Sequence, residues 1–99
     1  MTITRKELSE GCVEFAVTGR LETATAPQLS DELTDLTGIS ELSFDFTDLD
    51  YISSGGLRVL LSTYKRLMVT GGKVIVKNIN DGIKEIMELT GFNEILDIR

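Results

Sequence analysis

The chain has 99 residues, 41% of them hydrophobic, and its 10 basic and 16 acidic residues give it a net charge of −6. This size predicts one compact domain, residues 1–99, with a single modest hydrophobic core. The negative charge is the wrong sign for a domain that binds mainly a nucleic-acid backbone, and it equally disfavours binding to an anionic membrane surface.

The chain contains no histidine and a single cysteine, Cys12. Without histidine it lacks the commonest general base, the Ser-His-Asp arrangement and most transition-metal sites. A lone cysteine forms neither an intrachain disulfide nor a cysteine-based zinc cluster. Acids and lysines can still do some chemistry, but we expect a protein that is not an enzyme and that uses no metal and no cofactor.

No apolar run approaches the ~20 residues that a membrane-spanning helix needs. The N-terminal residues 1–11 alternate polar and apolar side chains and lack the apolar core of a signal peptide. We therefore expect a cytoplasmic protein without a membrane span.

The chain is expected to begin with two strands, residues 2–9 and 11–19, joined by a hairpin turn at 9–11 and ended by Gly19. The second strand alternates, so that one of its faces is buried and the other only partly so. The buried set is Val13, Phe15 and Val17, and the other set is Cys12, Glu14 and Ala16.

Residues 25–38 have the pattern of an amphipathic helix that ends near Gly38. Thr25 and Gln28 have the spacing of a capping box, and Pro27 falls in the first turn, where its missing N–H is not needed. The apolar stripe of this helix consists of Ala26, Leu29, Leu33 and Leu36.

A strand at 41–46 follows, with its apolar residues on one face, and then a connection through residues 47–51. The next helix has its apolar residues at three- and four-residue intervals over 57–68, which predicts that Met68 lies in the core. Its stripe consists of Leu57, Leu60, Leu61, Tyr64, Leu67 and Met68. The strand at 73–79 is apolar on both faces, which is typical of a central strand.

A third helix is expected at 81–91, with Ile83, Ile86 and Met87 inward and Gly91 as its C-terminal cap, before an edge strand at 94–98. The order of elements is β-β-α-β-α-β-α-β. Helical crossovers join parallel neighbours and are right-handed in nearly all cases. The sequence therefore predicts an α/β fold, a small mixed sheet with helices packed mainly on one face.

Two adjacent serines, Ser53 and Ser54, precede the second long helix. A serine there can cap the free N–H groups of the helix, or it can be a phosphorylation site, because those groups and the helix dipole favour an anion. Capping is the commoner role, with Ser54 as the cap and Ser53 as a loop residue. A G-x-S-x-G nucleophile motif is absent, since Tyr51 and Ile52 stand two places before the serines.

Three aspartates, Asp45, Asp48 and Asp50, come just before the serines. They could form a cation site, but their spacing does not match a calcium loop, and a solvated loop is the commoner arrangement. A phosphate adds roughly −1.5 to −2 charges. Beside these acids that addition would be locally disruptive, unless the helix end absorbs it.

Three stretches of the chain, in order and with similar spacing, resemble the STAS domain, in particular the stand-alone anti-sigma factor antagonists of bacteria. They are "GRLETATAPQL", "LSFDFTDLDYISSGGLRVLLSTYKRL" and "GGKVIVKNINDGIKEIMELTGF". Together they cover nearly the whole chain, and the central stretch is the most specific. The resemblance implies the STAS fold and a binding protein controlled by phosphorylation.

In that family a serine or threonine at the start of the second helix is phosphorylated by a partner that is both an ATP-dependent serine kinase and an anti-sigma factor. The unphosphorylated antagonist binds this partner and frees the sigma factor, and a metal-dependent serine phosphatase resets it. Aligned through Gly56 and Leu57, the acceptor here is Ser54, with Ser53 as the alternative. The partner-binding residues that the resemblance implies are Glu22, Thr23, Asp48, Ser53, Ser54, Gly55, Gly56 and Arg58.

The flanks of the acceptor depart from the family pattern. Family members that regulate sigma factors often have aspartate where this chain has Ser53, and serine or threonine where it has Gly55. Glu22 stands where aspartate is frequent and keeps the charge. Some STAS domains do not switch and serve as scaffold subunits of signalling or lipid-transport complexes; this is the alternative function, in which Ser54 is only a cap.

Overall fold

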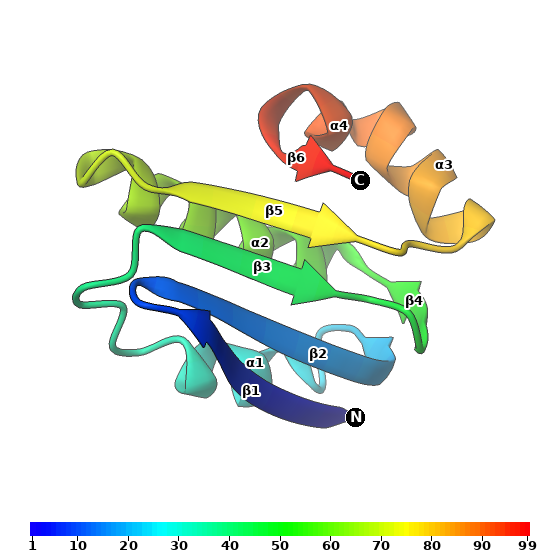
Figure 1. The fold of residues 1–99 in the computed structure, drawn as a ribbon. Helices are drawn as coiled ribbons and strands as arrows, with labels where there is room; N and C mark the ends of the chain where they lie inside the picture. Colours follow the sequence, from blue (N-terminus) through cyan, green and yellow to red (C-terminus); the bar gives the residue numbers. More distant parts are fainter.

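The computed structural model describes residues 1–99, which form six strands and four helices (Figure 1). Their bounds in chain order are β1 Thr2–Ser9, β2 Cys12–Leu21, α1 Ala26–Glu32, β3 Glu41–Asp45, β4 Leu49–Ile52, α2 Ser54–Val69, β5 Lys73–Lys77, α3 Asp81–Thr90, α4 Phe92–Ile95 and β6 Asp97–Ile98.

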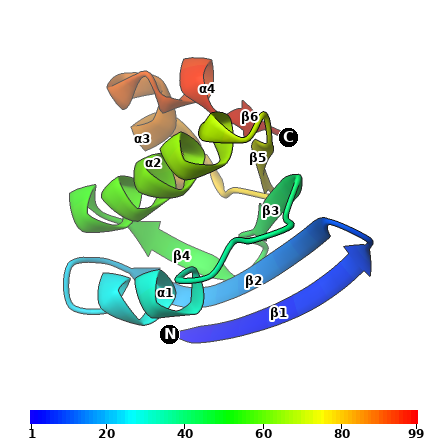
Figure 2. The same cartoon turned by 90° about the vertical axis from the view of Figure 1, so that its left-hand side faces the viewer.

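The sheet is mixed, with the strand order β1-β2-β3-β5-β6. β1 is antiparallel to β2, and the other neighbours are parallel. β4 lies off this path and pairs in parallel with the end of β2. The helices lie to one side of the sheet (Figure 2). The predicted fold class is thus confirmed, and β5 is an inner strand as expected.

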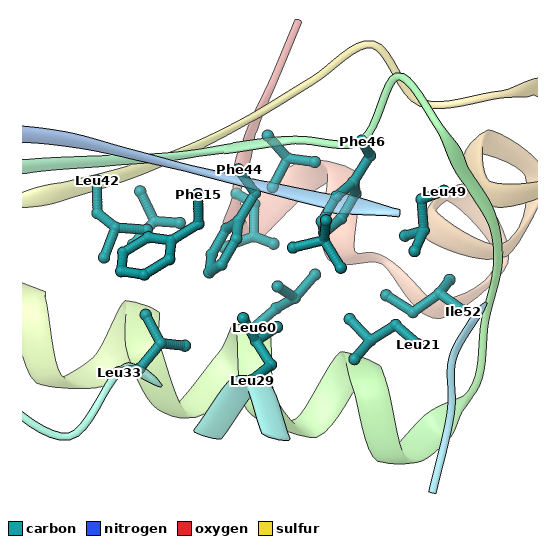
Figure 3. Close-up of a cluster of buried hydrophobic side chains, with 14 of the residues drawn as sticks. Phe15, Leu21, Leu29, Leu33, Leu42, Phe44, Phe46, Leu49, Ile52 and Leu60 are labelled. Atoms are coloured by element: carbon teal, nitrogen blue, oxygen red, sulfur yellow. The ribbon is translucent and has the colours of Figure 1, made fainter. Parts of the chain in front are cut away.

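The core fills the space between the sheet and helices α1 and α2. Alternation on β2 buries Val13, Phe15 and Val17, and the aromatic residues Phe44 and Phe46 of β3 and its end are fully buried. Figure 3 shows the aromatic rings from the strands facing leucines from α1 and α2. These leucines are Leu29 of α1, Leu33 directly after α1, and Leu60 of α2. The apolar stripes of the two helices are therefore what holds them against the sheet.

Helix α1 is shorter than its apolar stripe predicts, because it ends at Glu32 and not near Gly38. The capping box is also absent. Thr25 Oγ1 donates to the carbonyl of Arg20 at 2.7 Å and accepts from the N–H of Glu22 at 3.0 Å. The hydroxyl is thus used to fold the loop before α1, and it does not cap the helix.

Strand β2 does not end at Gly19 but continues to Leu21. Gly19 has φ +91° and marks the register shift where β2 changes its partner from β3 to β4. β4 itself occupies residues that the sequence analysis assigned to a connection.

Two further predictions at the C-terminal side are wrong. The segment at 94–98 is not one strand, because residues 92–95 form α4 and only Asp97 and Ile98 pair with β5. Met68 is 55% exposed and lies outside the core, whereas Met87 is fully buried as predicted. None of the helices is long and apolar enough to cross a membrane.

Candidate functional site

The predicted acceptor region lies where β2 and β4 end side by side. Leu21 is the register partner of Ile52, and the N–H of Ser53 donates to the Leu21 carbonyl at 2.9 Å. This pairing places the loop after β2 next to the start of α2. We call the group formed by Glu22, Thr23 and residues 53–58 the helix-entry site.

The two serines of the helix-entry site differ in position. Ser53 is the N-cap of α2, with extended backbone at φ −105° and ψ 179°, and Ser54 is the first helical residue. The Oγ of Ser53 is buried and has no hydrogen-bond partner, whereas Ser54 is exposed. The prediction that Ser54 caps the helix and that Ser53 is a loop residue is therefore wrong. Only Ser54 presents its side chain to an approaching molecule.

The start of α2 is electrostatically open. No side chain caps it, and no acidic residue lies in its first turn. The first N–H groups of a helix have no partner within the helix, and the helix dipole adds a partial positive charge there. An anion on the side chain of Ser54 would meet a favourable field.

The two glycines after Ser54 are buried against the loop and the strands. A Cβ on Gly55 would lie 3.0 Å from Thr23 Cα, and one on Gly56 would lie 2.7 Å from the Leu21 side chain and 2.8 Å from its carbonyl. The resemblance implies that both glycines belong to the partner-binding surface. The structure shows another reason for them, because only glycine lets α2 pack this closely on the end of β2.

The side chains of Arg20, Glu22 and Tyr51 form a cluster that was not predicted from the sequence. The Arg20 guanidinium lies 3.3 Å from the Glu22 carboxylate and 4.5 Å from the centre of the Tyr51 ring, which is 37% exposed as a residue. Arg20 and Tyr51 are register partners on β2 and β4. Sequence reasoning missed this pair because it did not recognise β4 as a strand.

A groove of about 440 Å³ runs between α1 and α2 and begins at the helix-entry site. Thr23, Gly55 and Arg58 line it at that end. At the far end Arg66 donates to the carbonyls of Leu33 and Thr34 at 2.6 and 2.8 Å and so satisfies the C-terminal end of α1. Only three of its twelve lining residues are hydrophobic.

The structure does not gather all the predicted partner-binding residues in one place. Asp48 lies in the turn between β3 and β4, where its carbonyl accepts from the N–H of Gly19 at 3.0 Å. The length of β4 separates it from Ser54. Arg58, in contrast, lies one helical turn after Ser54 and is exposed.

Of the three aspartates before the serines, Asp45 holds the turn after β3 with its side chain. Asp45 accepts hydrogen bonds from the Thr47 hydroxyl at 2.6 Å and from the Asn78 amide at 3.0 Å, and these bonds hold the pKa of its carboxyl below the usual range. No group of three or more His, Cys, Asp or Glu side chains is placed to hold a metal ion. The cation-site alternative for these aspartates therefore lacks support from the geometry.

The family follows from the chain as a whole. The family model described as STAS domain matches residues 4–99. The chain belongs to the STAS domain family. This STAS domain is 26% identical over 91 residues to the anti-sigma-B factor antagonist of Bacillus subtilis, covering 91% of this chain and 84% of that protein. It is 32% identical over 91 residues to BtrV of Bordetella bronchiseptica, whose name also refers to an anti-sigma factor antagonist. That match covers 90% of this chain and 78% of BtrV.

Among solved structures, the fold is like that of the anti-sigma factor antagonist SpoIIAA in its unphosphorylated form. The TM-score is 0.81, with 99% of this chain and 87% of that chain covered. SpoIIAA of Bacillus has also been solved in a phosphorylated form. At 14% identity this likeness establishes the fold of the STAS domain and not its partners.

Proposed function

We propose that this STAS domain is an anti-sigma factor antagonist, a binding protein whose affinity for its partner is switched by phosphorylation of Ser54. The partner is an ATP-binding serine kinase that is also an anti-sigma factor, and the interaction takes place in the cytoplasm. The observation that carries the proposal is the exposed hydroxyl of Ser54 at an uncapped helix start, where Thr23 packs against Gly55. Relatives named as anti-sigma factor antagonists support it.

The covalent step is an ordinary phosphoryl transfer. The Oγ of Ser54 attacks the γ-phosphorus of ATP bound to the kinase, the new O–P bond forms as the bond to the β-phosphate oxygen breaks, and ADP leaves. The hydroxyl proton passes to a base of the kinase. A metal-dependent serine phosphatase reverses the change by hydrolysis, so the chain itself supplies no catalytic residue.

Phosphorylation would act on binding through charge and shape. It replaces a small neutral hydroxyl, to which the partner surface binds, by a group that carries roughly −1.5 to −2 charges. The uncapped end of α2 stabilises the phosphate within the domain, so the modification changes the surface without unfolding it.

The acceptor can be identified by incubating the purified protein with its cognate kinase and ATP and locating the phosphate by mass spectrometry. We expect one phosphate per chain, on Ser54. Ser54→Ala should abolish incorporation, and Ser53→Ala should not, because the Ser53 Oγ is buried. Phosphate on Ser53, or on neither serine, contradicts the site.

The switch can be separated from the scaffold alternative by measuring binding to the kinase by calorimetry. We expect Ser54→Ala to bind and Ser54→Asp to bind at least tenfold more weakly, which corresponds to about 1.4 kcal/mol. Ser62→Asp is the matched control, since Ser62 is an exposed serine two turns along the same helix. Equal binding by all three variants would indicate a STAS scaffold that does not switch.

A further inference from the structure

Arg58, which the resemblance places on the partner-binding surface, also lies close to Ser54 on α2. It follows Ser54 by four residues in α2, so the two side chains lie on the same face of the helix, one turn apart. Both residues are exposed, and Gly55, Gly56 and Leu57 between them are buried. The outer face of the first turn of α2 is therefore formed by Ser54 and Arg58.

The guanidinium of Arg58 has no carboxylate partner. The ion pairs of the chain are Arg20 with Glu22, Lys73 with Glu41, Lys77 with Glu14 and Arg99 with Asp97. Arg58 is not among them, and it makes no side-chain hydrogen bond. Asp31 lines the same groove from the α1 side. Its carboxylate does not come within the 4.0 Å of the Arg58 guanidinium that an ion pair requires.

The other cations near the site are engaged or distant. Arg20 is held between Glu22 and Tyr51, and Arg66 is held by the carbonyls of Leu33 and Thr34. Lys65 is exposed but lies eleven residues after Ser54 along the 16-residue helix. Arg58 is thus the free cation within one turn of the acceptor hydroxyl.

We propose that Arg58 is a positioning residue that binds the phosphoryl group on Ser54 within the same chain. The inference rests on the proposed function, because it needs a phosphate at this residue. Side chains four apart on a helix have their Cβ atoms roughly 5–6 Å apart, and the fork of a guanidinium matches two phosphate oxygens. An anion placed before a cation along the helix is also the favourable order for the dipole.

This contact has a chemical consequence for the modified domain. A guanidinium beside the phosphate favours its doubly charged form over the singly charged one, because the attraction grows with the charge of the phosphate. More of the phosphorylated protein then carries two negative charges near neutral pH. Arg58 also keeps the phosphate on the outer face of α2, at the mouth of the groove, where a partner that binds the free hydroxyl meets it.

The experiment is a pH titration of the phosphate by ³¹P NMR on protein with phosphoserine incorporated at position 54 during translation. No kinase is involved. We expect Arg58→Gln to raise the second pKa of the phosphate by about 0.2 to 0.4, the shift that corresponds to the energy of an ion pair on a helix surface. Arg58→Lys keeps the charge and should restore at least half of the difference. The effect should shrink in 1 M salt, where the screening length is about 3 Å.

Lys65→Gln is the matched control, because it removes the same charge from the same exposed face at a greater distance. It should leave the phosphate titration unchanged to within about 0.1. Arg58→Gln and Lys65→Gln giving the same curve, or both matching the unaltered chain, would overturn the proposal. A kinase that modifies some other residue contradicts the proposed function but leaves this measurement valid, so the two failures are distinguishable.

Discussion

The starts of α2 and α3 have the same backbone and opposite side-chain chemistry. Ser53 and Asn80 are both N-caps with extended backbone, and each carbonyl accepts from the N–H four residues on at 2.9 Å. At α3 the Asn80 Oδ1 accepts from the N–H of Ile83 at 2.8 Å, and Asp81 adds a negative charge in the first turn. At α2 the Ser53 hydroxyl accepts nothing, and no acid is present.

The difference shows which of the two ends is built for stability. A side-chain cap and an acid in the first turn each stabilise a helix, typically by about 1 kcal/mol and by about 0.3–1 kcal/mol. α3 has both and α2 has neither. α2 instead depends on its length, its buried stripe and the close contact of its glycines with β2, and its N–H groups and positive dipole end stay available for an anion on Ser54.

The largest effect is expected from breaking the glycine contact that replaces the cap at α2. A methyl group on Gly56 would lie 2.7 Å from Leu21 Cγ, 2.8 Å from Ile52 Cγ1 and 2.8 Å from the Leu21 carbonyl, so either the helix or β2 must move. Overpacking of this kind costs about 1–3 kcal/mol. We expect Gly56→Ala to lower the free energy of unfolding by about 2 kcal/mol in urea denaturation, or the melting temperature by about 10 °C.

Gly82→Ala is the matched control, because Gly82 lies in the first turn of α3 and its added methyl group would meet only Asn80 Oδ1, at 3.4 Å. Alanine is preferred over glycine in a helix by about 0.5–1 kcal/mol. This variant should therefore be as stable as the unaltered chain or more so. Equal losses in the two variants would show that tight packing does not distinguish the two ends.

The second effect comes from removing the cap of α3. The Asn80 side chain accepts from Ile83 N–H and its amide donates to the carbonyls of Leu49 and Asp50, at 3.1 and 3.3 Å. Loss of a cap typically costs about 1 kcal/mol, and the donated bonds add to it. We expect Asn80→Ala to lower the free energy of unfolding by about 1–2 kcal/mol.

Asn93→Ala serves as its control. Asn93 is an exposed asparagine in α4 with no side-chain hydrogen bond to the protein. Its replacement should stay within about 0.5 kcal/mol of the unaltered chain, as is usual for surface positions. If Asn80→Ala and Asn93→Ala behave alike, the hydrogen bonds of Asn80 contribute nothing measurable and α3 is no better capped than α2.

The fold was predictable from sequence where the signal is local. Strict alternation on β2, aromatic alternation at Phe44 and Phe46 and the leucine stripes of α1 and α2 each specify one buried face. The strand residues are buried as expected, and so is most of each stripe, but Leu36, Leu61 and Tyr64 are only half-buried and Met68 is exposed. β4 was missed because Leu49 and Ile52 are buried while the two residues between them are exposed, so a four-residue strand shows no alternation. Its pairing with β2 depends on a register shift at Gly19, which is a tertiary feature.

The helix start that carries the candidate site was predictable from sequence, but its detail was not. Apolar periodicity begins at Leu57, and Gly55 and Gly56 have no side chains to extend it, so the first helical residue could not be fixed from sequence. The neighbours that make both glycines necessary, Thr23 and Leu21, are more than thirty positions away in the chain. The pairing of Arg20 with Tyr51 depends in turn on β4, and it was missed for the same reason.

The smallest effect is expected at Ser53, and it bears most directly on the difference between the two helix starts. Serine-to-alanine replacement at an N-cap typically costs about 1 kcal/mol, because a hydrogen bond is lost. The Ser53 Oγ has no such bond to lose, and a buried hydroxyl without a partner is itself unfavourable. We therefore expect Ser53→Ala to change the free energy of unfolding by less than about 0.5 kcal/mol in the same urea assay, well below the loss in Asn80→Ala. A loss near 1 kcal/mol would mean that the hydroxyl caps α2 in solution, and the start of α2 would then not be open to an anion on Ser54 in the way its geometry indicates.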